Sequence, residues 1–95
     1  MAVTGLLSLH LQLPGCASLK EKRGRLKPLL ARLHKQFNIS AAEVDFLDAW
    51  GDSLLACALV SNDVAHVQRV LQNVEHWIED EWRDVMVVEA RIEML

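Results

Sequence analysis

The sequence predicts one α+β domain spanning residues 1–95, with the element order strand, helix, strand, strand, helix, strand. Apolar residues alternate near both ends of the chain, two amphipathic segments each follow a strand, and a turn-rich segment separates the two central strands. Right-handed crossovers in two such split units produce a four-stranded antiparallel sheet in the spatial order 4-1-3-2. Both helices then lie on one face, which is the ferredoxin-like βαββαβ sandwich.

The first strand and the first helix have the clearest patterns. Apolar residues stand at every second position over 3–13, which is typical of a strand with one buried face, and Pro14-Gly15 ends it. Ser18 and Glu21 have the spacing of a capping box, so we expect a helix over about residues 18–36. Its expected core stripe is Leu19, Leu26, Leu30, Leu33 and Phe37.

Pro28 stands inside this expected helix, where it lacks a backbone donor and crowds the carbonyl of Gly24. We expect the flexible glycine backbone to accommodate a kink near residues 24–28. The alternative is a loop up to residue 26, with the proline in the first turn of a shorter helix. Asn38 then ends the helix.

The remaining elements follow from the same two periodicities. An alternating segment precedes a cluster of turn formers, a short apolar run follows, and Ser61-Asn62-Asp63 supplies helix-capping side chains. The expected elements are a strand over 39–47, a hairpin loop over 48–52, a strand over 54–60, a helix from about 64 to 80 and a last strand over 85–94.

Positive charge is concentrated on the first helix. The formal net charge is −3, yet seven of the ten lysines and arginines lie within sixteen positions. They are Lys20, Lys22, Arg23, Arg25, Lys27, Arg32 and Lys35. Three of them lie in the first turn, where cations oppose the helix dipole. We expect this row to bind the phosphates of a nucleic acid, and the alternative is a solvated face paired with carboxylates of the same or a neighbouring subunit.

The face of the predicted sheet without helices is partly apolar. Along the third strand, alternate residues share this face; they are Leu54, Ala56, Ala58 and Val60. Because large apolar patches usually mark contacts, we expect a homodimer or higher homo-oligomer through this surface. The alternative is a monomer with small exposed alanines.

Other side chains indicate chemistry less directly. Glu43 and Asp45 would share a face and suit a hard cation, although a charged edge strand that prevents aggregation explains them better, and we expect no metal site. His10 faces outward with no evident nucleophile, and Cys16 precedes a helix N-terminus. Trp50 is expected to be a packing or interface residue, with base stacking as the alternative.

Composition excludes several classes of protein. No apolar run approaches the roughly 18 residues of a membrane-spanning helix, so we expect no membrane association. The N-terminus lacks the basic segment and cleavage site of a secretory signal. The two cysteines, Cys16 and Cys57, are too few for a disulfide scaffold and favour a reducing cytoplasm.

Three stretches carry a family resemblance: Ser18-Leu19-Lys20-Glu21-Lys22-Arg23, residues 37–43, and 61–63 with 65–67. Over nearly its whole length the chain resembles the YlxP-like family of small bacterial proteins, a family of unknown function. The resemblance implies a ferredoxin-like fold and, through gene neighbours for translation initiation and 30S maturation, a role near RNA or the ribosome. It implies no catalytic residues, and Lys20, Lys22 and Arg23 carry over only as signature positions.

We therefore expect a non-enzymatic cytoplasmic binding protein that associates with RNA or the ribosome through the basic helix, without a cofactor. The alternative is a structural or regulatory homo-oligomer, in which the basic helix serves subunit contacts or a small anionic ligand. An enzyme is the third hypothesis. Acylphosphatases share this strand order and use a phosphate-binding loop with an arginine, and the loop over residues 14–18 contains none.

Overall fold

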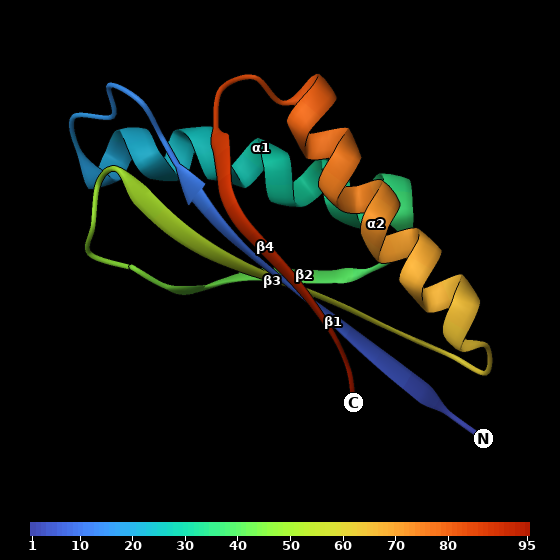
Figure 1. The fold of residues 1–95 in the computed structure, drawn as a ribbon. Helices are drawn as coiled ribbons and strands as arrows, with labels where there is room; N and C mark the ends of the chain where they lie inside the picture. Colours follow the sequence, from blue (N-terminus) through green and yellow to red (C-terminus); the bar gives the residue numbers. More distant parts are fainter.

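In a computed structural model, which describes residues 1–95, the chain forms the expected six elements in the expected order. They are β1 (Val3–Gln12), α1 (Leu19–Phe37), β2 (Ser40–Asp45), β3 (Asp52–Ser61), α2 (Val64–Glu81) and β4 (Met86–Met94). The antiparallel sheet has the order β2-β3-β1-β4, and both helices lie on one face (Figure 1). This is the predicted order counted from the other edge, so the ferredoxin-like fold is confirmed.

The core lies between the sheet and the helices. Leu7, Leu9 and Leu11 of β1 are fully buried, because alternate strand residues face the helices. On β3, Leu55 and Cys57 occupy the same side, and burial raises the pKa of the Cys57 thiol to about 12. The buried stripe of α2 has the spacing expected of a helix that covers a sheet; it is Val67, Leu71, Val74 and Ile78.

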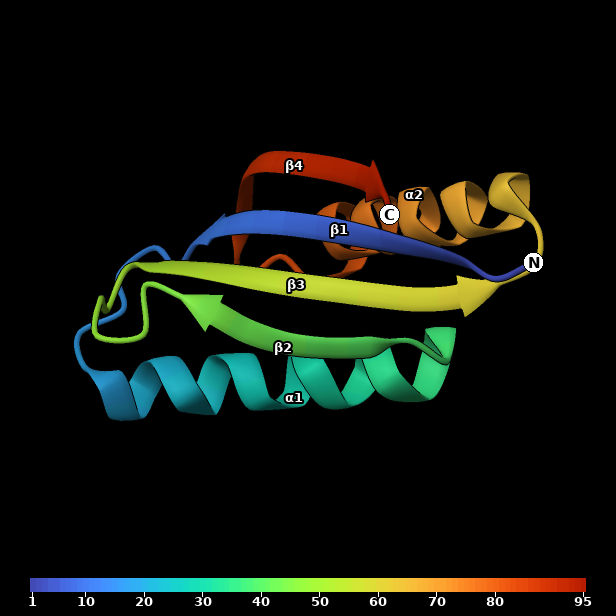
Figure 2. The same ribbon diagram turned by 90° about the horizontal axis from the view of Figure 1, so that it is seen from below.

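The two helices cover different parts of the sheet. α2 packs against β1, β3 and β4, whereas α1 lies along the edge strand β2 (Figures 1 and 2). As a result, much of the long outer side of α1 contacts no other element. Neither helix is both long and apolar enough to cross a membrane.

α1 has the predicted extent. It runs from Leu19 to Phe37 with Pro28 inside it, so the alternative of a shorter helix starting near the proline is wrong. The residue that caps its C-terminus is Asn38, which adopts the left-handed conformation (φ 51°, ψ 49°) that asparagine tolerates better than most residues. Pro28 is exposed, so its ring lies on the solvent side of the helix.

The N-terminus of α1 has a variant of the predicted capping box. The backbone N–H of Glu21 donates to Ser18 Oγ at 3.0 Å, as expected. The Glu21 carboxylate reaches one residue further back than predicted and accepts from the backbone N–H of Ala17 at 2.5 Å. This bond, with a smaller contribution from Cys16, holds the pKa of Glu21 below its usual range.

β2 is shorter than predicted and contains a bulge between Glu43 and Asp45. Glu43 lies opposite Leu55 on the helix-covered side, and Asp45 lies opposite Leu54 on the open face. The expectation that these two carboxylates share a face is therefore wrong, because a bulge breaks the period of two. No group of three or more histidine, cysteine or acidic side chains gathers closely enough to hold a metal ion.

Gly5 of β1 lies directly beneath α2, with no room for a larger residue. A Cβ atom at this position would lie 2.3 Å from Val67 Cγ1 and 3.0 Å from Leu71 Cδ1. We predict that Gly5→Ala lowers the free energy of unfolding by about 1–3 kcal/mol, measured by urea denaturation. Gly24→Ala is the control: its Cβ meets nothing within 4 Å, and in a helix it should stabilise by about 0.5–1 kcal/mol. Equal stabilities of the two variants would contradict the close packing.

Candidate nucleic-acid interface along the first helix

Lys22 lies inside the protein, although it was grouped with the seven cations of α1 that we expected to bind phosphates. Its side chain is 2% exposed, and its Nζ lies 2.8 Å from Glu43 Oε2. Nζ also donates to the backbone carbonyls of Phe46 and Ala49, each at 2.7 Å. Three acceptors match the three N–H groups of an ammonium. The expectation that Lys22 contacts a nucleic acid is therefore wrong.

The error comes from the orientation of α1. Its buried stripe is Lys22, Leu26, Leu29 and Leu33, with spacings of four, three and four residues. The predicted stripe ran through Leu30 and Phe37, which are only partly buried at its margin. A lysine at the head of a four-three-four apolar series is the sequence signal for this orientation. Its acceptors lie more than twenty positions away, and no local pattern reveals them.

Two arginines are held on the flank of α1 that faces α2 and the loop before β4. Arg25 donates to the carbonyl of Pro14 at 2.9 Å and to the backbone carbonyl of Asp84, and its Nε lies 3.3 Å from Asp84 Oδ2. Arg32 lies over the ring of Trp77, with its guanidinium carbon 5.6 Å from the centroid. Arg25 thus ties the loop and helix together, and it is not the free surface cation that was expected.

Lys20, Arg23 and Lys27 occupy the opposite flank, and we call these three residues the cationic flank. All three are exposed and none forms an ion pair. Steps of three and four residues bring them to one side of the helix. His34 continues this side and accepts a hydrogen bond from the backbone N–H of Ala41 in β2 at 3.1 Å, which orients the flank toward the free edge of β2.

Lys35 is the fourth exposed cation of α1 without an ion pair. It lies near the C-terminal end of the helix, on the side farthest from the sheet. The seven predicted residues therefore divide into a buried lysine, two tethered arginines and four unpaired cations. Only the last four are exposed without a tether.

The loop between β2 and β3 lies beside the first turn of α1 (Figure 2). Besides the two bonds from Lys22, the backbone N–H of Ala49 donates to the carbonyl of Phe46 at 3.0 Å. The carbonyl of Gly51 accepts from the backbone N–H of Leu13 at 2.9 Å. The loop is thus held at both ends, and its conformation is tied to the position of α1.

His10 has partners that the sequence did not reveal. Its Nε2 lies 2.9 Å from Asp52 Oδ1, and its ring stacks on Phe46 with a centroid distance of 5.0 Å. The imidazole borders a hollow of about 340 Å³ on the open sheet face, together with Ser8 and charged residues of β4. The only hydrogen bond of the His10 ring within the chain is the one to Asp52, and none joins it to the Ser8 hydroxyl.

The predicted apolar row of β3 lies on the open face. Leu54, Ala56 and Ala58 are half-buried there, and Val60 is 67% exposed. The row is bordered by β2 on one side and by β1, whose outward residues are mostly polar, on the other, and the charged residues of β4 lie beyond β1. The open face therefore combines a narrow apolar strip with polar and charged margins.

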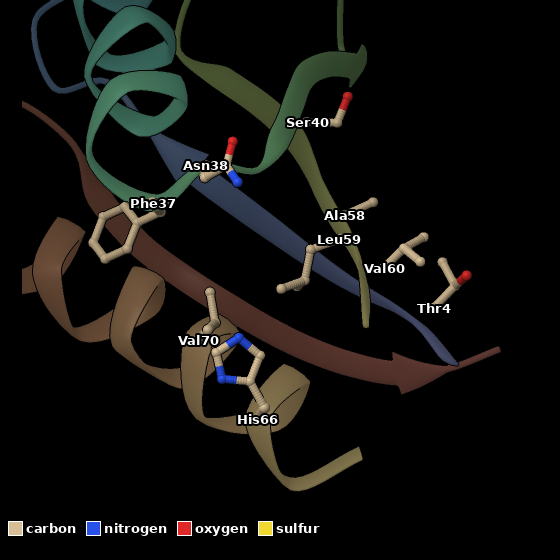
Figure 3. Close-up of a pocket in the computed structure, with 9 residues that line it drawn as sticks. All are labelled: Thr4, Phe37, Asn38, Ser40, Ala58, Leu59, Val60, His66 and Val70. Carbon is tan, nitrogen blue, oxygen red and sulfur yellow. The ribbon is translucent and has the colours of Figure 1, made fainter. Parts of the chain in front are cut away.

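A larger hollow of about 510 Å³ opens between the C-terminal end of α1 and the first half of α2 (Figure 3). Phe37, Leu59 and Val70 form apolar walls, and Asn38 and His66 contribute polar groups. Its lining contains no carboxylate, thiol or ammonium group. The sequence did not single out this hollow, and no hydrogen bond joins its two hydroxyl groups, of Thr4 and Ser40, to the imidazole of His66.

The fold and its surface define a small ferredoxin-like α+β protein with a cationic helix along one sheet edge. The fold resembles that of the de novo designed protein Foldit4, with a TM-score of 0.57 and 9% identity, over 100% of this chain and 97% of that one. Residues 4–92 match the family described as "Protein of unknown function (DUF503)", and the chain belongs to that family. It is 37% identical over 62 residues to the uncharacterized protein YlxP of Bacillus subtilis (strain 168), covering 65% of this chain and 67% of that protein. The family resemblance seen in the sequence is confirmed.

Replacing Lys22 tests the buried ammonium site. Lys22→Met retains the aliphatic stem but leaves two loop carbonyls without their donor and Glu43 without its cationic partner, with only the Ser53 hydroxyl still donating to that carboxylate. We predict that it lowers the free energy of unfolding by about 3 kcal/mol, measured by urea denaturation. Lys20→Met, two residues away and exposed, is the matched control and should change stability by less than about 0.5 kcal/mol. A Lys22→Met variant as stable as this control would show that the loop is held by other contacts.

Proposed function

We propose that the protein is a non-enzymatic RNA-binding module that contacts phosphates through the cationic flank. The supporting observation is that Lys20, Arg23 and Lys27 are exposed without ion pairs, while two neighbouring carboxylates have other partners. Glu43 is neutralised by Lys22, and Glu21 is turned back onto the N-terminus of α1. Three cations without partners on one rod can release counterions from a polyanion, which is the main sequence-independent source of nucleic-acid affinity.

The negative charge of the rest of the chain favours one orientation of a bound nucleic acid. The chain is anionic overall, with a formal net charge of −3, so a polyanion is attracted only where the local positive potential exceeds this background. The acids of α2 and β4 lie elsewhere in the fold. A nucleic acid would therefore meet α1 first and be repelled from most other surfaces, which orients the complex without base-specific contacts.

The proposed partner is structured RNA in the cytoplasm, with the ribosome as the favoured source. The translation context that the family resemblance implies favours RNA over DNA. The exposed edge of the molecule is also suited to A-form RNA. The minor groove of such RNA is wide and shallow, so a flat protein surface can reach it and the phosphates beside it. No cofactor is needed for this kind of binding.

Charge reversal on the flank tests the proposal. We predict that the triple variant Lys20→Glu, Arg23→Glu, Lys27→Glu binds a ribosomal RNA fragment much more weakly. The slope of log affinity against log salt should fall in magnitude by roughly 2, since each phosphate contact contributes about 0.7–0.9. The measurement is a binding titration repeated across a salt series.

The control for this variant changes the same total charge elsewhere. Arg69→Glu, Arg83→Glu, Arg91→Glu reverses three other exposed cations, so both triple variants have a net charge of −9 instead of −3. The control should keep most of the affinity and the original salt slope. Equal weakening in both variants would overturn the α1 interface, and a parent protein that binds no RNA at low salt would overturn the function itself.

A second candidate function is a structural or regulatory homo-oligomer that associates through the open sheet face. The supporting observation is the strip of Leu54, Ala56, Ala58 and Val60, which no element of the chain covers. Both edge strands are unsuitable for pairing, because β2 and β4 each contain a bulge and β2 also has the inward-facing Glu43. In such an assembly the cationic flank would serve subunit contacts or a small anionic ligand.

Sedimentation velocity at micromolar concentration tests this second candidate. We predict that the parent sediments as a dimer or larger species and that Val60→Glu shifts it to a monomer, because a charge would be buried in the interface. Val64→Glu is the control, since Val64 is 47% exposed but lies at the start of α2, away from the open face. A parent protein that is already monomeric would contradict oligomerisation.

A further inference from the structure

We infer that the RNA site takes an unpaired nucleotide, whose base stacks on Trp50 while the adjoining phosphates lie on the cationic flank. This inference rests on the proposed function and names the kind of RNA that the same site binds. The ligand would be a single strand, a loop or a bulge, and a continuous duplex would lack the second contact.

Trp50 differs from the other two tryptophans in having a free ring. Trp77 and Trp82 pack together with a centroid distance of 5.8 Å, and Trp77 also meets Phe37 at 5.7 Å. Trp50 is 53% exposed and has no aromatic or cationic partner. Its indole is therefore the one large aromatic surface of the chain that a ligand can cover without displacing a protein contact.

The backbone on both sides of Trp50 is fixed. Before it, the carbonyl of Ala49 accepts from Lys22 Nζ at 2.7 Å. After it, the carbonyl of Gly51 accepts from the backbone N–H of Leu13 at 2.9 Å. A ring on such an anchored segment loses little conformational freedom when a base stacks on it, which favours binding.

Trp50 and the cationic flank belong to the same end of the molecule. The β2–β3 loop and the first turn of α1 lie together in both views (Figures 1 and 2), and Lys22 joins them directly. Lys20 and Arg23 are in that first turn or immediately after it. A strand that follows α1 with its phosphates therefore has the loop within reach of its bases.

The β2–β3 loop and α1 differ in charge, so they suit different parts of a nucleotide. Asp48 is exposed two residues before Trp50, and Leu47 beside it is exposed and apolar. The carboxylate repels phosphates from the loop, while the indole and leucine side chains offer an apolar surface. A base fits this loop and a phosphate does not, whereas the reverse holds on α1. In a duplex the bases are stacked on one another and offer no free face to the indole.

The test compares one RNA oligonucleotide as a single strand and as a duplex with its complement. Trp50→Ala should weaken binding of the single strand by roughly 5- to 150-fold, the range of one aromatic–base stack, and leave duplex binding and the salt slope unchanged. Trp50→Phe should retain part of the affinity, and Val64→Ala, an exposed position at the start of α2, should change it little. The fluorescence of the parent should be quenched by the single strand more than by the duplex.

The outcomes separate this inference from the function on which it rests. If Trp50→Ala binds the single strand as well as the parent does, while charge reversal on the flank abolishes binding, the stacking is wrong and the RNA-binding function stands. Equal weakening of single strand and duplex by Trp50→Ala would also overturn the stacking. If neither the single strand nor the duplex binds the parent protein in a salt-dependent manner, both the RNA-binding function and the stacking on Trp50 are wrong.

Discussion

The buried ammonium of Lys22 is the interaction on which the arrangement of this end of the molecule depends. A charge removed from water is costly unless it is paired and fully hydrogen-bonded, and here one carboxylate and two carbonyls meet that requirement. The acceptors come from β2 and from the β2–β3 loop, so the ion pair joins the first turn of α1 to an edge strand and a hairpin. It also explains why Glu43 faces inward on an edge strand, where its charge would otherwise be opposed by no cation and its carboxylate would keep only the hydrogen bond from the Ser53 hydroxyl at 2.7 Å.

This pairing also determines which cations are free. Because Lys22 occupies the buried stripe, Lys20, Arg23 and Lys27 are turned toward the edge of β2, and Arg25 and Arg32 are turned toward α2 and the loop that follows it. Cations on one side of α1 therefore hold elements together, while those on the other side have no carboxylate partner. One flank of the basic helix is thus tied into the fold, and the other carries the unpaired cations on which the proposed RNA contact depends.

Much of the fold was predictable from local patterns. Alternation over residues 3–13 located β1, the Ser18 cap and Asn38 located both ends of α1, and the 3-4 spacing located the buried face of α2. The bulge in β2 was not predictable, because a single extra residue changes the facing of Asp45 without changing the composition of the segment. For the candidate site, the sequence showed that positive charge is concentrated on the first helix. It did not show that Lys22 and Arg25 are held by other parts of the chain, because their acceptors are distant in sequence.

The sequence by itself determined the order of elements, the ferredoxin-like class, the family and the location of positive charge on one helix. These features depend on periodicity and composition, which neighbouring residues encode. The tertiary structure alone decided which of the seven cations are buried, tethered or free, and it alone placed Trp50 beside the first turn of α1. Those properties depend on acceptors and neighbours that the chain brings together only when it folds.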